Sequence, residues 1–111
     1  MFLSGKAGRD VLKGGAGDDI LYGFGGDDSL SGGGGSDVLA GHEGNDSLNG
    51  GTGDDYLLGG LGTDVIEGGA GEDWAAYEDA GAAVNVSLAL TGWQETGGGG
   101  RDKLSGIENL Y

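Results

Sequence analysis

The sequence predicts an all-β protein: a right-handed parallel β-roll, or β-solenoid, with a C-terminal capping segment. Three observations predict this fold. Glycine supplies 30 of the 111 residues and proline none, aspartate recurs every nine residues, and an aliphatic residue follows nearly all of these aspartates by two positions. Abundant glycine disfavours helices and long strands, because glycine loses the most conformational freedom on folding. The strict period argues against the disordered acidic linker that composition alone would suggest.

Three positions repeat with a period of nine residues. The aspartates are Asp10, Asp19, Asp28, Asp37, Asp46, Asp55, Asp64 and Asp73. A glycine lies two residues before each of them, at Gly8, Gly17, Gly26, Gly35, Gly44, Gly53, Gly62 and Gly71. Another lies five residues before, at Gly5, Gly14, Gly23, Gly32, Gly41, Gly50, Gly59 and Gly68. Two residues after the aspartate come Leu12, Leu21, Leu30, Leu39, Leu48, Leu57 and Ile66, with Leu3 in the same phase. The unit is therefore G-G-x-G-x-D-x-U-x, where U is a large aliphatic residue.

Each half of this unit predicts one structural element. The six residues G-G-x-G-x-D favour a tight turn, in which glycine allows positive φ and bare carbonyl groups face one point. The three residues x-U-x form a minimal strand whose central side chain points inward. Two units complete a coil of 18 residues, and parallel crossovers are right-handed. Successive turns therefore lie on opposite edges of a flattened solenoid, Asp10, Asp28, Asp46 and Asp64 on one edge and Asp19, Asp37, Asp55 and Asp73 on the other.

The stacked aspartates predict calcium sites. Strands in neighbouring coils lie about 4.8 Å apart, so adjacent carboxylates repel each other by about 1 kcal/mol even in water. A hard dication between the coils reverses this repulsion, and Ca²⁺ accepts the irregular oxygen cage that carboxylates and the carbonyls of the motif glycines can supply, whereas Mg²⁺ demands a strict octahedron. Soft metals lack ligands, because the chain has no cysteine and one histidine. Four turns on each edge leave three gaps, which predicts six Ca²⁺ ions or more.

The net charge supports a cation as the main partner. The chain has 19 acidic and five basic residues, with a formal charge of −14, which argues against nucleic acid and anionic membranes. No apolar run is long enough for a transmembrane segment, and the first ten residues do not resemble a cleavable signal peptide. Without cysteine, a secreted form needs a staple other than disulfides. One inward aliphatic residue per nine is also a thin core, so metal binding and folding are predicted to be one event.

The unit and its spacing resemble the calcium-binding nonapeptide repeat of the RTX (repeats-in-toxin) proteins over residues 3–76. The resemblance implies a module of a larger protein that Gram-negative bacteria export by type I secretion, and that is unfolded at low cytosolic calcium and folds outside the cell. Its partners would be calcium ions and other domains of the parent. Some RTX parents are enzymes, but this chain has no HExxH, no GxSxG and no nucleophile–base pair, so we expect no catalysis here.

The second glycine of the motif is replaced on one edge, by Lys6, Phe24 and His42, which are 18 residues apart. Gly15, Gly33, Gly51 and Gly69 keep it on the other edge. We interpret this as a position that tolerates a side chain because mainly its carbonyl group matters. A role for His42 as a separate metal ligand or catalytic base is disfavoured, since no nucleophile or second histidine accompanies it.

The outward strand positions predict one polar and one apolar face. The polar face carries Val11, Lys13, Ser29, Ser31, Ser47, Asn49, Val65 and Glu67. The apolar face carries Phe2, Ser4, Ile20, Tyr22, Val38, Ala40, Tyr56, Leu58, Trp74 and Ala76. An apolar stripe of this kind indicates a covered surface. Either the C-terminal segment or another domain covers it, or it serves an adhesive or ligand-binding module, which is the alternative function.

The repeat array ends at residue 76, after Ala75 has taken the aliphatic position. We therefore predict a β-roll of eight nonapeptide repeats over 1–76 and a capping segment over 77–111. Within the segment, 84–90 alternates as a strand. Residues 97–105 rebuild one degenerate repeat around Asp102, a further candidate calcium ligand two residues out of phase. In RTX proteins a phrase like "DKLSGIENL" commonly closes a repeat block, and the segment shows no convincing C-terminal secretion signal.

Overall fold

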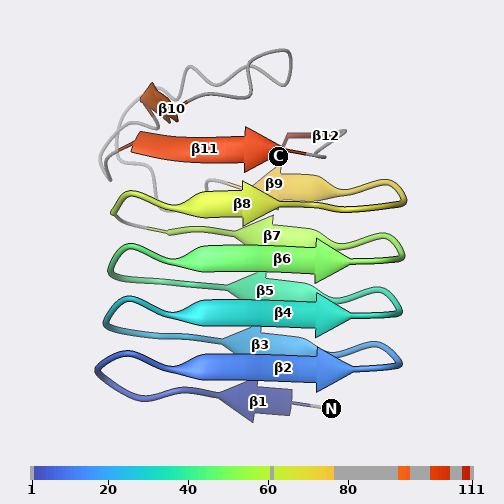
Figure 1. The fold of residues 1–111 in the computed structure, drawn as a ribbon, viewed down its shortest axis with the longest axis horizontal. Coiled ribbons are helices and arrows are strands. Elements are labelled where there is room, and N and C mark those ends of the chain that lie inside the picture. Colours follow the sequence, from blue (N-terminus) through green and yellow to red (C-terminus); the bar gives the residue numbers. More distant parts are fainter. Residues whose placement is uncertain (1, 61, 77–92, 96–100, 106–108, 111) are drawn as a thin grey trace.

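The computed structural model describes residues 2–60, 62–76, 93–95, 101–105 and 109–110, and these form strands and turns without any helix (Figure 1). No segment in this part of the chain is thus a membrane-spanning helix. The strands are β1 (Phe2–Ser4), β2 (Val11–Gly15), β3 (Ile20–Tyr22), β4 (Ser29–Gly33), β5 (Val38–Ala40), β6 (Ser47–Gly51), β7 (Tyr56–Leu58), β8 (Val65–Glu67), β9 (Trp74–Ala76), β10 (Trp93–Glu95), β11 (Arg101–Ser105) and β12 (Asn109–Leu110).

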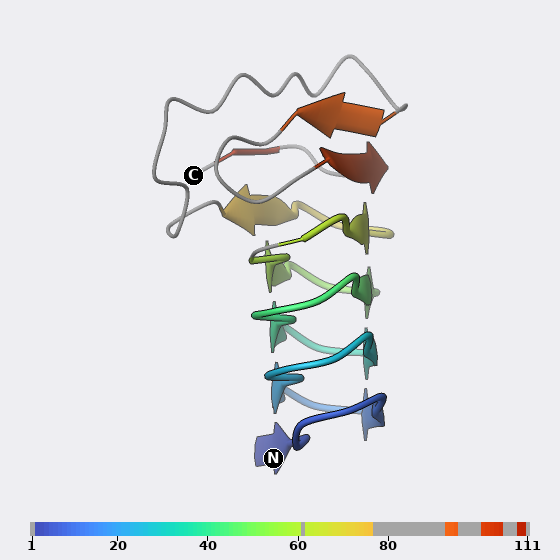
Figure 2. The same ribbon diagram turned by 90° about the vertical axis from the view of Figure 1, so that its left-hand side faces the viewer.

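The strands form two six-stranded sheets that face each other (Figure 2). Sheet A has the order β1-β3-β5-β7-β9-β12, and sheet B has the order β10-β11-β8-β6-β4-β2. Partners in the repeat region are parallel and 18 residues apart, as in Leu21↔Leu39 and Leu30↔Leu48. In Figure 1 the chain crosses the front from left to right and returns behind as it rises, so the coil is right-handed. The predicted β-solenoid is confirmed, with about four turns.

A single column of aliphatic side chains fills the space between the sheets. Leu21, Leu30, Leu39, Leu48, Leu57, Ile66 and Ala75 are all at most 1 % exposed. Leu3 and Leu12, in the first coil, are only partly buried against this column. Because the middle residue of each three-residue strand points inward, the aliphatic position of the motif supplies this column, and Ala40 beside it is also buried. Ala75 keeps this register opposite Leu57 even though its side chain is small.

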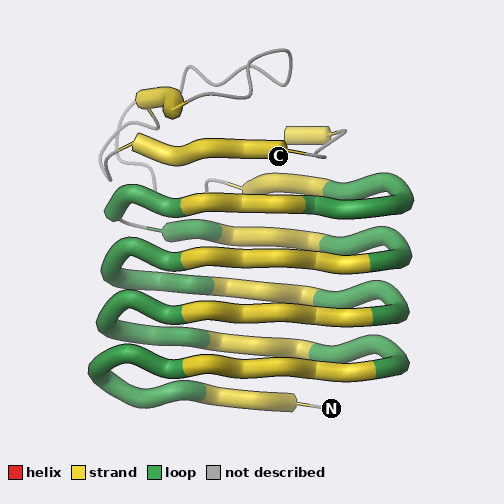
Figure 3. Tube along the Cα trace, in the orientation of Figure 1, coloured by secondary structure: helices red, strands yellow, loops and turns green. Residues whose placement is uncertain are grey.

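Three repeat-array strands of sheet B are longer than the predicted three residues. β2, β4 and β6 each include both glycines of the following turn, and Gly15↔Gly33 and Gly33↔Gly51 continue the pairing (Figure 3). The backbone bonding extends one residue further, from the Gly34 N–H to the Gly15 carbonyl oxygen. Unsubstituted glycine pairs therefore let neighbouring turns on this edge lie close enough to bond as a ladder.

The C-terminal strands continue both sheets beyond the repeat array. β11 pairs in parallel with β8 and places Leu104 opposite Ile66, while β12 pairs with β9 and places Leu110 opposite Ala75. β10 then pairs antiparallel with β11. These three strands extend the sheets at the end of the solenoid (Figure 2). The predicted strand over 84–90 lies outside the described residues, and the 1–76/77–111 division remains a prediction.

Candidate metal centre

The motif aspartates form one buried column on each edge of the solenoid. From Asp19 to Asp73 the seven aspartates of this series are at most 3 % exposed, while Asp10 in the first coil is partly buried. Each side chain turns inward at the point where its turn meets the next strand. Two columns of carboxylates therefore run along the solenoid, one on each side of the aliphatic core.

From Asp28 to Asp73, one oxygen of each motif carboxylate accepts a hydrogen bond from the preceding coil. Oδ1 of Asp28 accepts the backbone N–H of Asp10 at 2.8 Å, and Oδ1 of Asp46 accepts that of Asp28 at 2.8 Å. The same bond, always between residues 18 apart in the sequence, joins Asp19 to Asp37, Asp37 to Asp55, Asp46 to Asp64 and Asp55 to Asp73. These bonds orient the carboxylates beyond the first of each column in the same way.

The second oxygen has no hydrogen-bond donor at the central positions of both columns. Oδ2 of Asp28, Asp37, Asp46 and Asp55 is buried and accepts no hydrogen bond. Burying a carboxylate oxygen without a donor or cation is costly. Such an oxygen is suited to a proton or to a hard cation, and it recurs at each coil. The donor set therefore fits Ca²⁺, which binds oxygen ligands only.

The first glycine of the motif is required by packing rather than by backbone conformation. A Cβ atom at Gly23 would lie 2.6 Å from Oδ2 of Asp28, and one at Gly5 would lie 2.6 Å from Oδ2 of Asp10. Neither residue has a positive φ. The expectation that the motif glycines allow positive φ thus holds for only part of the set. At the first position, glycine leaves room for the carboxylate five residues later.

The glycine two residues before each aspartate does need the left-handed conformation. Gly44 has φ 109°, and its seven counterparts from Gly8 to Gly71 also have positive φ. A Cβ at Gly44 would collide with the carbonyl oxygen of Gly26, and one at Gly62 would collide with that of Gly44. These carbonyl oxygens therefore point along the solenoid toward the next coil. They form a column of acceptors in the same turns as the carboxylates.

Burial raises the pKa values of the central aspartates. The pKa of Asp46 rises from 3.8 to about 7 and that of Asp55 to about 6, chiefly because burial penalises the charged form. The charged aspartates of neighbouring coils raise these pKa values further. The pKa values of Asp28 and Asp37 are raised for the same main reason. Without a cation, burial thus makes these four carboxyl groups easier to protonate than a free aspartate.

The structure brings the predicted residues together in the turns, but the side chains alone do not form a complete site. Among the described residues no three His, Cys, Asp or Glu side chains cluster in a way that could hold a metal ion. A cation in a turn would therefore take much of its coordination from backbone carbonyl groups. The strand register also aligns Asp102 with Asp64, because Lys103 pairs with Val65.

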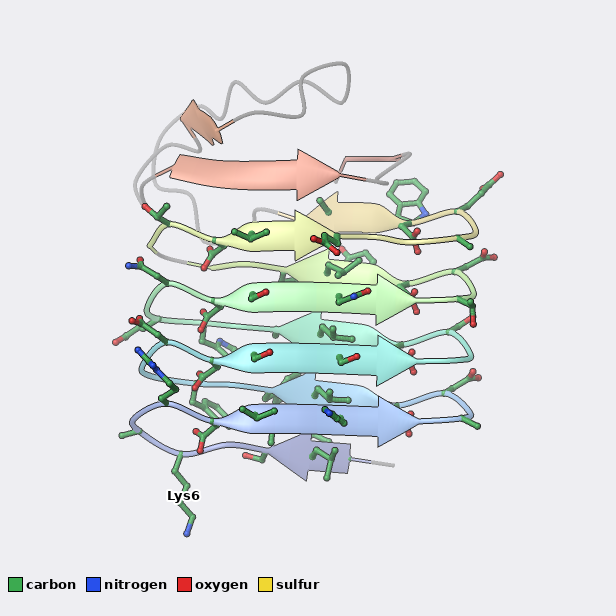
Figure 4. The ribbon with its side chains drawn as sticks, viewed as in Figure 1. Lys6 is labelled. Carbon is green, nitrogen blue, oxygen red and sulfur yellow. The ribbon has the colours of Figure 1, made fainter. Side chains whose placement is uncertain are left out.

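The substituted second position carries an aromatic cluster. Phe24 and His42 have φ 66° and 69°, and their rings stack with centroids 5.0 Å apart. Tyr22 packs edge-on against both rings. Side chains in this left-handed region cost roughly 1–2 kcal/mol, which aromatic pairing offsets in part. Lys6 points away from the solenoid (Figure 4) while its N–H bonds to Oδ2 of Asp10.

Sequence reasoning missed a second set of polar side chains, which stand immediately before the motif aspartates. Asp27 and Asn45 accept backbone N–H groups of the following coil through Oδ1. The signal was present in the doublets "DD" and "ND", since a polar or charged residue precedes each motif aspartate. Because the residue type varies at this position, the motif specifies no residue there.

We predict that Gly23→Ala weakens the site and that Gly25→Ala does not. The new methyl group at residue 23 must displace the Asp28 carboxylate. Overpacking of this kind lowers the free energy of unfolding by about 1–3 kcal/mol. A Cβ at Gly25 meets nothing within 4 Å and requires no positive φ, so its effect should stay within about 0.5 kcal/mol. Urea denaturation in saturating Ca²⁺ measures both changes. Equal stabilities would show that the first glycine is not needed for packing.

The raised pKa values predict that acid stabilises the metal-free fold. Since the fold binds more protons than the unfolded chain between the ordinary pKa of 3.8 and the folded values of about 6 to 7, stability falls as pH rises through this window. We expect a chelated sample to gain β structure when it is acidified from about pH 8 to about pH 5. Far-UV circular dichroism measures this gain, and it should shrink in Asp46→Asn. A pH-independent spectrum would contradict the prediction.

Comparison with known proteins agrees with the motif and the fold. A family model of the RTX calcium-binding nonapeptide repeat (4 copies) matches residues 4–39 and 40–75, which together make up more than half of the chain. No curated protein and no solved structure matches the sequence significantly. The matched residues coincide with the coils built by β1 to β9. The chain therefore belongs to the RTX calcium-binding nonapeptide repeat family, whose repeat is a structural calcium-binding unit and not an enzymatic one.

Proposed function

We propose that this chain is a β-roll module that binds six or more Ca²⁺ ions and folds on binding them. The observation that supports it most directly is the row of buried Oδ2 atoms without donors at Asp28, Asp37, Asp46 and Asp55. These atoms recur on both edges, coil after coil, in a chain with a net charge of −14. A fold that concentrates carboxylates in this way is stable only when cations or protons neutralise them.

The ligands in this proposal come from two parts of each turn. The motif aspartates from Asp10 to Asp73 supply carboxylate oxygens, and the glycines at the first and fourth motif positions supply carbonyl oxygens. Asp102 would add a ligand above Asp64, since the strand register aligns the two. Bound Ca²⁺ supplies positive charge and a flexible coordination shell, which a strictly octahedral Mg²⁺ does not.

The location of the parent protein would decide where this module folds. RTX repeats typically occur in secreted bacterial proteins, and we infer that this module belongs to a larger type I-secreted protein. Such a module remains unfolded in the calcium-poor cytosol and folds in calcium-rich surroundings outside the cell. The electrostatic repulsion between its carboxylates keeps the metal-free chain open. Other domains of the parent would be its protein partners.

The outer face of sheet A favours a second candidate, an adhesive or ligand-binding module. Phe2, Ile20 and Trp74 on this face are 59 %, 38 % and 39 % exposed, and the described C-terminal strands extend the sheets instead of lying across it. Replacing Tyr22, Tyr56 and Trp74 by alanine separates the two candidates. Reduced stability of the calcium-loaded fold would indicate internal packing, whereas unchanged stability would leave this face available for a partner.

Calcium titration tests the main proposal. We expect a chelated sample near neutral pH to lack most β structure by circular dichroism, to gain it with Ca²⁺, and to gain much less with Mg²⁺. Calorimetry at saturation should count at least six ions. The coupling of binding to folding is expected because the aliphatic core is one side chain wide. A fully folded spectrum in excess chelator would rule out calcium-driven folding, and two or three ions would rule out paired turns on both edges.

A further inference from the structure

A second ladder of hydrogen bonds runs beside each column of carboxylates. It is made by Asp18, Asp27, Asn45 and Asp54, the residues immediately before motif aspartates. Their Oδ1 atoms accept the backbone N–H groups of Ser36, Asn45, Thr63 and Glu72 at 2.8, 2.9, 2.9 and 3.0 Å. These four side chains are exposed, unlike the buried motif aspartates. No part of the calcium motif assigns them a role.

The two ladders bond in opposite directions along the solenoid. Oδ1 of Asp28 accepts an N–H from Asp10 in the preceding coil. Oδ1 of its neighbour Asp27 accepts an N–H from Asn45 in the following coil. The doublet therefore ties three successive coils together. At Asp18 and Asp19 both bonds reach the following coil but run in opposite directions: Asp18 accepts from the N–H of Ser36, and the N–H of Asp19 donates to Asp37.

The second ladder fixes the direction of a carbonyl group. In a trans peptide the N–H of Asn45 and the carbonyl group of Gly44 point in opposite directions. The N–H points back to Asp27, and the carbonyl oxygen of Gly44 points forward, where a Cβ at Gly62 would collide with it. Holding the N–H therefore holds this carbonyl group toward the next coil. Asp18 holds the carbonyl group of Gly35 in the same way, since a Cβ at Gly53 would collide with that oxygen. For Gly62 and Gly71 the same direction follows from the planar peptide, because Asn45 and Asp54 hold the N–H groups of Thr63 and Glu72.

This role needs an acceptor and not a charge. Asn45 makes the bond with a neutral amide oxygen at the same distance as Asp27. An asparagine at this position would therefore keep the hydrogen bond without the charge.

We infer that Asp18, Asp27, Asn45 and Asp54 are positioning residues, which orient the carbonyl groups of Gly35, Gly44, Gly62 and Gly71 toward the calcium ions without binding calcium through their own charge. The inference rests on the proposed function. In each doublet the second residue, the motif aspartate, would be a metal ligand. The first residue would be a hydrogen-bond acceptor that needs no charge and that orients a carbonyl ligand of the metal.

Two multiple variants with the same charge test this inference. One carries Asp18→Ala, Asp27→Ala, Asn45→Ala and Asp54→Ala, and the other carries Asp18→Asn, Asp27→Asn and Asp54→Asn. Both lose three negative charges, but only the second keeps the four acceptors. The calcium midpoint is measured by circular dichroism. Bound Tb³⁺, used in place of Ca²⁺, reports the number of coordinated waters through its luminescence lifetimes in H₂O and D₂O.

We expect the alanine variant to raise the calcium midpoint on the order of threefold, because four hydrogen bonds are lost and six ions share the effect. It should also add water to bound Tb³⁺, since freed carbonyl groups leave the metal. The asparagine variant should match the wild type in both measurements or bind calcium more tightly. The single variant Asp28→Asn, which removes the charge of a proposed ligand, should raise the midpoint.

Three outcomes would contradict the inference or the proposed function. A weakened asparagine variant would show that the charge of these residues is needed, which overturns the inference. A weakened alanine variant with unchanged Tb³⁺ hydration would reduce the ladder to a general stabilising role and would also overturn it. An unchanged midpoint in Asp28→Asn would instead overturn the proposed function, because the buried carboxylate would then not be a ligand.

Discussion

The fold depends on buried carboxylates in which a backbone N–H bonds to one oxygen and the protein supplies no donor to the other. From Asp28 onward, Oδ1 of each motif aspartate accepts a hydrogen bond from a backbone N–H of the preceding coil, as Asp46 does from Asp28. This bond sets the coil spacing and aims the second oxygen into the interior of the turn. At Asp28, Asp37, Asp46 and Asp55 that oxygen has no donor. The interaction that aligns the coils is therefore the same one that leaves a negative charge to be neutralised, and stability is coupled to the surrounding ions.

The glycines follow from this constraint in two different ways. At Gly23 the carboxylate of Asp28 occupies the space of a side chain, so glycine provides volume. At Gly44 the backbone is left-handed and the carbonyl oxygen of Gly26 approaches the Cα atom, so glycine provides both conformation and close approach. Of the three glycine positions, only the second carries side chains, and there Phe24 and His42 support each other by stacking. On the other edge a Cβ at the same position, at Gly33 or Gly51, would collide with the carbonyl oxygen of the preceding coil. The motif thus keeps glycine where the metal turn needs room.

The sequence alone predicts the coil, its handedness and its inward residues, because a fixed period of nine becomes geometry by simple counting. It does not predict interactions that cross between coils at variable positions. The acceptor ladder of Asp27 and Asn45 falls on a position that the motif leaves free. The alignment of Asp102 with Asp64 also does not follow from the nine-residue period. β11 takes its register from its parallel pairing with β8, in which Lys103 lies opposite Val65 although their separation in the sequence is not a multiple of the repeat. Strand pairing, and not spacing along the chain, decides such positions.

The exposed acceptors and the buried carboxylates differ in how they depend on ions. A bond such as that from Thr63 N–H to Asn45 Oδ1 joins neighbouring coils without any charge. It therefore favours stacking whether or not a cation is present. The buried column opposes stacking until it is neutralised, since burial and neighbouring aspartates raise the pKa of Asp46. Nearest-neighbour contacts set the stability of a solenoid. A constant attraction opposed by an ion-dependent repulsion at every coil boundary makes the whole array respond to calcium together.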